Sequence, residues 1–203
     1  MRPELVTTAI FVSVAVLAGC GTSAPAGPSG TGSPPATSSL VYSVPAGNGG
    51  GAASGSYTTV NASFGGNVRT TCVPNPNIAG SYCPSLQVLV RPFNDSTCQF
   101  FVDPPVGEPL MPRAYAVAQR LASAGVAGFS MNCSKGGTAC NWSVGQFALY
   151  ELQANVDGVV TRLHITFEQT CSNIDGSLYG SGKGTGELWI IDGNKGFFDA
   201  IAR

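Results

Sequence analysis

The chain has 203 residues, a formal net charge of −1 and a single histidine, and only 10% of its residues are charged. This charged fraction is far below the usual quarter, and the sequence contains no cluster of lysine and arginine. Composition and charge therefore argue against a nucleic-acid partner.

The first residues predict an export signal, residues 1–19. Leu5–Val16 is an uncharged apolar run that is too short for a comfortable membrane span. It is followed by Leu17-Ala18-Gly19-Cys20, which resembles the lipobox of bacterial lipoproteins. The resemblance implies that Cys20 is lipid-modified and becomes the first residue of a protein anchored in the cell membrane, facing outside the cytoplasm. The alternative is an ordinary secretory signal with an incidental cysteine.

Residues 20–56 are expected to form a lipid-anchored flexible linker. Gly21–Ser39 carries no charge and consists almost entirely of Gly, Ala, Pro, Ser and Thr, so it buries too little apolar surface to offset its ordering entropy. Leu40–Val44 is a small apolar island within this linker, and we expect it to be unstructured, although docking as a stray strand is an alternative. The composition changes near Tyr57, which places a single domain at residues 57–203.

The most informative stretch of this domain is Thr138–Cys171, where two alternating runs flank Asp157-Gly158, a strong signal for a two-residue hairpin turn. With this pair in the turn, Val156 faces Val159. The predicted apolar face then pairs Leu152 with Leu163, Tyr150 with Ile165, and Ala148 with Phe167. The opposite face pairs Gln153 with Arg162, Glu151 with His164, Leu149 with Thr166, and Phe147 with Glu168.

The other elements are short and separated by Gly- and Pro-rich turns, which predicts an all-β fold: an antiparallel β-sandwich, with a small β-barrel as the alternative. Arg113–Ala124 is either one short helix or an edge strand. The further predicted strands are Tyr57–Phe64 followed by Asn67–Thr71, Leu86–Val90 with Gln99–Val102, Gly128–Asn132, and Leu178–Gly180 with Glu187–Ile191.

Six cysteines beyond Cys20 predict three disulfides outside the cytoplasm, with fifteen possible connectivities. Cys171 continues the inward-facing series of the second hairpin strand and lies opposite Val144, just after Cys140. We therefore predict a bond between Cys140 and Cys171. The next prediction is Cys72 with Cys83, and Cys98 with Cys133 follows by elimination. A metal site is not favoured, since no C-x-x-C is present.

Several short motifs resemble a β-module of bacterial surface and exported proteins. They are Tyr115-x-x-Ala118-x-Arg120, Cys140-Asn141, Gly145-x-Phe147, Asp157-Gly158-x-Val160, Phe167-Glu168-Gln169-x-Cys171 and Leu178-x-Gly180. The resemblance implies a β-sandwich and the Cys140–Cys171 bond, with no known catalytic activity. The motifs of this module have no counterparts for Cys72, Cys83, Cys98 and Cys133.

The densest mixture of chemical groups is the polar face of the hairpin, with Glu151, Arg162, His164 and Glu168 as candidate site residues. His164 with Glu151 could serve as a relay, and Glu168 could act as an acid or base. A solvated face with ion pairs, Glu168 pairing with Arg162 or Arg120, is the simpler interpretation. The sequence marks no catalytic nucleophile, metal ligand set or cofactor motif.

These observations predict a cell-envelope lipoprotein that displays a non-catalytic module with a structural, adhesive or ligand-binding role. Its partners are the membrane, through the lipid anchor, and cell-wall or envelope components. One alternative is an exported hydrolase acting on glycan or peptidoglycan, which requires two converging carboxylates. Another is a carrier of an apolar ligand, which requires a large internal cavity.

Overall fold

The structure, a computed structural model, describes residues 33–45, 53–68, 73–74, 81–82, 86–93, 97–133, 142–173, 177–178 and 182–192. Within these ranges the fold is all-β, as the sequence predicts, and contains no helix. The strands are β1 (Ser39–Val44), β2 (Ala53–Thr58), β3 (Ala62–Val68), β4 (Val73–Pro74), β5 (Ser81–Tyr82), β6 (Leu86–Pro92), β7 (Cys98–Asp103), β8 (Arg113–Gln119), β9 (Ala127–Cys133), β10 (Trp142–Ala154), β11 (Val160–Ser172) and β12 (Gly184–Ile191).

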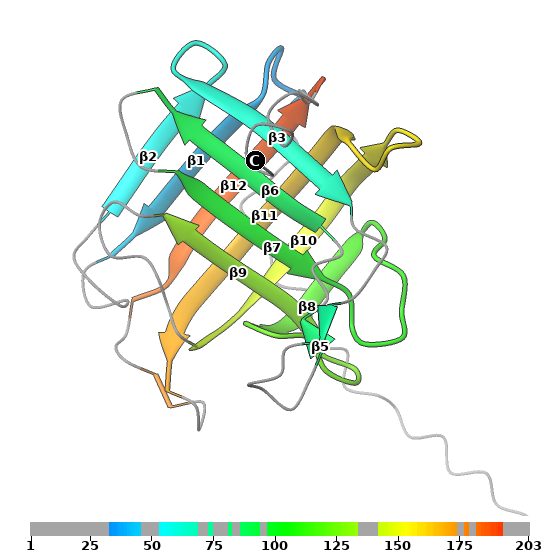
Figure 1. Cartoon of the computed structure of the whole chain (residues 1–203). Coiled ribbons are helices and arrows are strands. Elements are labelled where there is room, and N and C mark those ends of the chain that lie inside the picture. Colours follow the sequence, from blue (N-terminus) through cyan, green and yellow to red (C-terminus); the bar gives the residue numbers. More distant parts are fainter. Residues whose placement is uncertain are drawn as a thin grey trace, which may run out of the picture.

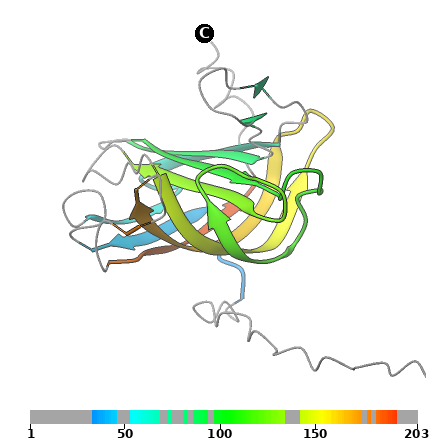
Figure 2. The same cartoon turned by 90° about the horizontal axis from the view of Figure 1, so that it is seen from below.

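Ten strands form one sheet in the order β2-β1-β12-β11-β10-β8-β9-β7-β6-β3, and β4 and β5 form a separate ribbon. In Figure 1, β3, β6, β7 and β9 cross in front of β1, β12, β11 and β10. Figure 2 shows the same sheet curling around its interior, so that it is nearly closed into a barrel. Of the two predicted architectures, the fold is therefore closer to the small β-barrel than to an open sandwich.

The interior is filled by apolar side chains from both halves of the sheet. The aromatic rings meet there: Phe167 of β11 lies 5.6 Å from Phe100 of β7 and 5.2 Å from Phe129 of β9, measured between ring centroids. Phe129 also stacks on Phe147 of β10, 5.6 Å away, and Phe147 stacks on Tyr115 of β8, 4.4 Å away. Rings packed at these distances occupy the space that an apolar ligand carrier would need, and their burial drives closure of the sheet.

The turn between β10 and β11 is longer than the sequence predicted. The amide of Gly158 donates to the carbonyl of Asn155 (3.0 Å) and the amide of Asn155 donates to the carbonyl of Val159 (2.9 Å). Val156 is therefore at the exposed apex, not opposite Val159. The Asn155 side chain decides this, because its Oδ1 accepts the amides of both Asp157 and Val159 at 3.0 Å. Gly158 takes φ 79°, the left-handed conformation that glycine supplies in three-residue hairpin loops.

The predicted register is confirmed for three pairs: Glu151 with His164, Leu152 with Leu163, and Gln153 with Arg162. A β-bulge then inserts Tyr150 as an extra residue, which shifts all later pairs by one. The predicted pairs Tyr150–Ile165, Ala148–Phe167, Leu149–Thr166 and Phe147–Glu168 are consequently wrong; the observed pairs are Leu149–Ile165, Ala148–Thr166, Phe147–Phe167 and Gln146–Glu168.

The bulge has an energetic reason. It turns the large Phe147 and Leu149 side chains into the core, where they are 3% and 1% exposed, and leaves Tyr150 outside at 46%. An unbroken register would have turned Ala148 and Tyr150 inward in place of Phe147 and Leu149, which would exchange purely apolar side chains for a methyl group and a phenol whose hydroxyl needs a hydrogen-bond partner.

The expected linker also needs correction. The island at Leu40–Val44 is not part of a linker, because β1 lies inside the sheet between β2 and β12, with Leu40 fully buried. The sheet therefore includes Ser39–Val44, which precede the predicted start of the domain at Tyr57. β1 forms because it pairs with β12 and β2. The pairing with β12 joins residues far apart in the chain, and local composition does not reveal it.

The remaining corrections concern individual strands and turns. β3 runs through Gly65-Gly66 without a hairpin, and its turn precedes it at 58–61. Leu178 pairs with Ser172 in an isolated bridge, whereas β12 pairs with β11 and β1. Arg113–Ala124 contains the strand β8 in place of a helix, and β8 lies between β10 and β9, not at an edge of the sheet. A register shift against β10 lets Tyr115 and Ala118, three residues apart, both be buried.

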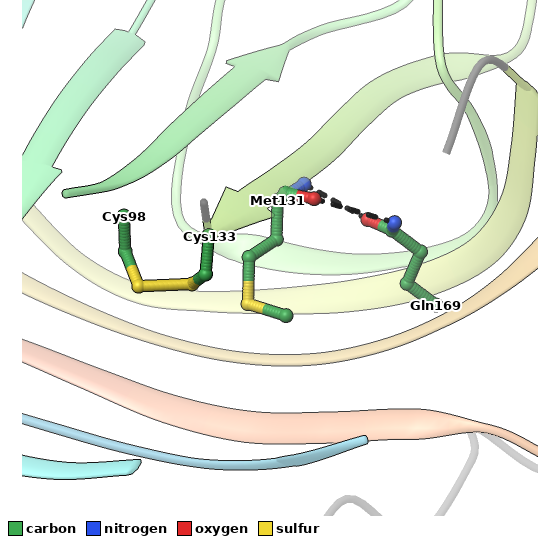
Figure 3. The surroundings of a disulfide bond; sticks show 4 residues. All are labelled: Cys98, Met131, Cys133 and Gln169. Atoms are coloured by element: carbon green, nitrogen blue, oxygen red, sulfur yellow. Dashed lines mark hydrogen bonds between the residues drawn. A yellow bond between two sulfur atoms is a disulfide. The ribbon is translucent and has the colours of Figure 1, made fainter. Parts of the chain in front are cut away.

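β8 and β9 form the only parallel pairing of the large sheet within the described residues, and it covers just Ala118–Ala127 and Gln119–Gly128. Beyond this short pairing, a side chain supplies hydrogen bonds that a neighbouring strand would make to β9. The amide of Met131 donates to Gln169 Oε1 at 2.9 Å, and Gln169 Nε2 donates to the Met131 carbonyl at 3.5 Å. Figure 3 shows this contact, in which Gln169 on β11 reaches the backbone of β9. Gln169 thus joins the two halves of the barrel.

The predicted bond between Cys98 and Cys133 is confirmed, with a sequence separation of 35. The two cysteines are directly opposite each other on β7 and β9, and Figure 3 places them beside Met131. Cys171 is fully buried, as its inward parity predicted, and is disulfide-bonded. Its predicted partner Cys140 lies outside the described residues, as do Cys72 and Cys83, so those two pairings stay predictions.

Candidate binding site on the outer face of the barrel

The four candidate residues, Glu151, Arg162, His164 and Glu168, lie on the outer face of β10 and β11, as the sequence predicted. The inner face of β11 is taken by Leu163, Ile165 and Phe167, which alternate with them. The structure does not gather the four into one cluster. It distributes them into three separate groups along the face, each built with partners from a neighbouring strand or segment.

The first group lies near the hairpin turn. Arg162 Nε donates to Glu151 Oε1 at 2.6 Å, and Gln153 Nε2 donates to the same oxygen at 3.0 Å. The hydrogen bond to Glu151 raises the pKa of Arg162 above its usual value. Glu151 is therefore paired with Arg162, and neither the predicted His164–Glu151 relay nor a Glu168–Arg162 ion pair forms.

The Glu151–Arg162 pair is expected to contribute little to stability, because about a third of each side chain is exposed to solvent (27% and 35%). We expect Arg162→Gln to leave the melting temperature close to that of the wild type, with any difference disappearing at high salt. Thermal denaturation at two ionic strengths, with Arg162→Lys as the charge-preserving control, measures this. A large, salt-independent loss in Arg162→Gln would show that the pair is a structural requirement.

The second group surrounds His164, which is 4% exposed. Its ring is stacked between Trp189 of β12 (3.6 Å) and Tyr150 of β10 (4.5 Å). His164 Nε2 lies 2.8 Å from Glu187 Oε1, which also accepts Trp189 Nε1–H at 3.1 Å. Glu187 is the sole hydrogen-bond partner of the His164 ring in the described part of the chain, so no hydroxyl or thiol nucleophile contacts the ring there.

The third group is centred on Glu168. Its Oε2 accepts Gln146 Nε2–H at 2.8 Å and forms an ion pair with Lys183 Nζ at 3.2 Å. The predicted partners, Arg162 and Arg120, are replaced by these two residues. The reason is the Tyr150 bulge, which brings Gln146 opposite Glu168, where Phe147 was expected.

Glu168 also borders an open depression of about 250 Å³. Gln146 and Glu168 separate it from a shallow apolar hollow over Ala114, Ala148 and Thr166. The depression, which we call the Glu168 depression, is lined by Val144, Gly145, Gln146, Glu168, Thr170, Leu178 and Lys183. Position 145, in the lining of the depression, requires glycine, because a Cβ there would lie 2.0 Å from the carbonyl oxygen of Glu168.

Sequence reasoning did not assign Gln146, Lys183 or Glu187 to this face. The alternating pattern of β11 was a sufficient signal for its own side chains. Which residues of β10, β12 and the segment before β12 lie beside those side chains depends on the bulge in β10 and on the pairing of β12 with β11. Period-2 alternation specifies neither of these.

Other parts of the candidate set lie outside the described residues, including Cys20, the predicted lipidation site. The described residues hold no group of three or more His, Cys, Asp or Glu side chains arranged to bind a metal ion. In the same part of the chain, no helix has the length and hydropathy needed to cross a membrane.

Comparison with protein-family models, with curated proteins and with solved structures yields no match for this chain.

Proposed function

We propose that the chain is a lipid-anchored module of the bacterial cell envelope, with a non-catalytic, ligand-binding barrel displayed outside the cytoplasm. The observation that carries the binding role is the Glu168 depression. Its polar groups come from β10, β11 and the segment before β12, and they are held in place by the Gln146–Glu168–Lys183 contacts. A site on strands of a packed core is preorganised, which lowers the entropy cost of binding.

The same contacts support binding over catalysis. Each of the three outer-face carboxylates, Glu151, Glu168 and Glu187, accepts hydrogen bonds from fixed cross-strand or neighbouring partners. A hydrolase acting through this face would need two of these three carboxylates converging on one cleft, whereas each of them is the centre of a different group. The packed rings of the interior likewise favour a surface binder over a carrier of apolar ligands.

The anchor follows from the lipobox-like end of the signal segment and the uncharged stretch after it. We expect wild-type protein to incorporate a fatty-acid analogue in bacterial cells and to fractionate with membranes. Cys20→Ala should abolish labelling and the normal cleavage, because the thiol is the acylated group. Wild-type protein that takes up no label would contradict the anchored part of the proposal.

The binding role has its own test. Full-length protein, purified in detergent, is expected to co-sediment with insoluble envelope material from which proteins have been removed, and to release no soluble products from it. Bovine serum albumin in the same detergent serves as the control for trapping. Protein that stays in the supernatant with every envelope fraction would contradict the binding role, and release of soluble products would favour the hydrolase.

A further inference from the structure

The Glu168 depression has a composition that restricts its ligand. Glu168 is the only carboxylate in its lining and Lys183 the only ammonium group among the described residues, and the two are paired at 3.2 Å. The lining that the described residues form is therefore close to neutral, which disfavours a ligand with a strong net charge of either sign.

The paired groups still offer hydrogen bonds to a ligand. Gln146 and Lys183 both contact Oε2 of Glu168, which leaves Oε1 as an available acceptor within the described residues. The side chain of Lys183 is 65% exposed, and an ammonium group has three donors. The amide oxygen of Gln146 and the hydroxyl of Thr170 complete a mixed set of donors and acceptors.

Apolar atoms lie beside these polar groups. Leu178 is 54% exposed at the rim, and Val144 is half-buried next to Gly145. A ligand that fits must therefore present hydroxyl groups that donate and accept on one side and a C–H surface on another. At about 250 Å³ the depression is smaller than the sites that enclose drug-sized ligands.

We propose that the Glu168 depression binds one uncharged sugar ring of an envelope glycan. A pyranose or furanose ring has the required combination of hydroxyl groups and a C–H face, and an open depression lets the rest of a glycan chain continue into solvent. This inference rests on the proposed binding function and names its ligand class. Few hydrogen bonds and an open site predict a dissociation constant on the order of 1 mM for a single sugar. Display of many copies on one membrane lowers the effective dissociation constant for a glycan that several copies bind at once.

The test uses the full-length protein in detergent micelles and saturation-transfer NMR with methyl glycosides of glucose, mannose, galactose and arabinose, and with N-acetylglucosamine. Glucuronate and glucosamine are the charged probes. We expect at least one neutral sugar to bind more tightly than both charged ones. Glu168→Gln should weaken binding by about tenfold or more, and Thr170→Val and Leu178→Ser by about threefold or more.

Glu151→Gln is the matched control, because it changes a carboxylate of the same sheet face outside the depression, and it should bind like the wild type. The melting temperature of each variant separates loss of binding from loss of fold. No binding of any neutral sugar, tighter binding of a charged probe, or equal binding by Glu168→Gln, Thr170→Val and Glu151→Gln would overturn the sugar assignment. The envelope sedimentation experiment is independent of this outcome, so a protein that sediments but binds no sugar at this site retains the proposed function and loses the inference.

Discussion

Replacing Cys98 and Cys133 together by alanine is expected to lower the free energy of unfolding by about 4 kcal/mol. The disulfide closes a loop with a sequence separation of 35, and the expected loss follows from the chain entropy that this loop removes from the unfolded state. Both cysteines are 1% exposed, so the two alanines also avoid burying the hydroxyl groups that serines would introduce. Chemical denaturation of the oxidised wild type and the double variant measures the difference.

The single variants Cys98→Ala and Cys133→Ala, with the remaining thiol kept reduced under argon, provide the comparison for lost packing. A double variant within about 1 kcal/mol of the wild type would contradict the chain-entropy argument. It would mean that residual pairing of the β7 and β9 segments already constrains the unfolded chain in this region.

Gln169→Leu is expected to cost about 3 kcal/mol of stability. Leucine has a similar volume, but it removes the two hydrogen bonds to Met131 and leaves a buried amide and a buried carbonyl of β9 without these partners. For a domain of this size the loss corresponds to a fall in melting temperature of roughly 10 °C. Thermal and denaturant unfolding followed by circular dichroism measure both quantities.

The control is Gln153→Leu, which makes the same substitution on the exposed part of the same hairpin and should change stability by no more than about 0.5 kcal/mol. Equal stability of the two variants would show that β9 does not depend on Gln169 for its hydrogen bonds. Closure of the barrel beyond the short β8–β9 pairing would then depend on apolar burial alone.

Local pattern was sufficient for several features. Alternation and turn composition predicted the all-β class, the β10–β11 hairpin, and its three pairs Glu151–His164, Leu152–Leu163 and Gln153–Arg162. Inward parity predicted the buried position of Cys171, and Cys98 with Cys133 was reached by elimination after the predicted pairings Cys140–Cys171 and Cys72–Cys83. These predictions depend on side-chain period and on residue type, both of which can be read from neighbouring residues in the chain.

The composition of the site required the tertiary structure. Whether β10 continues its register or bulges at Tyr150 depends on the total apolar surface that the core gains from Phe147 and Leu149, and that core includes strands far away in the chain. The bulge in turn decides that Gln146, and not Phe147, lies opposite Glu168. A period of two specifies faces only while the register is unbroken.

The Phe167-Glu168-Gln169-x-Cys171 segment shows which features of the site follow from local sequence and which require the tertiary structure. The sequence directed attention to Glu168 as the reactive group of this segment, and its outward position followed from alternation. The structure shows that Gln169 crosses to β9, and that Lys183 and Gln146 come from other elements to hold Glu168. Sequence by itself determined the alternation, the position of the hairpin and the cysteine count, because these are local. Only the tertiary structure decided the partners, because strand order and barrel closure bring together residues that local pattern leaves unrelated.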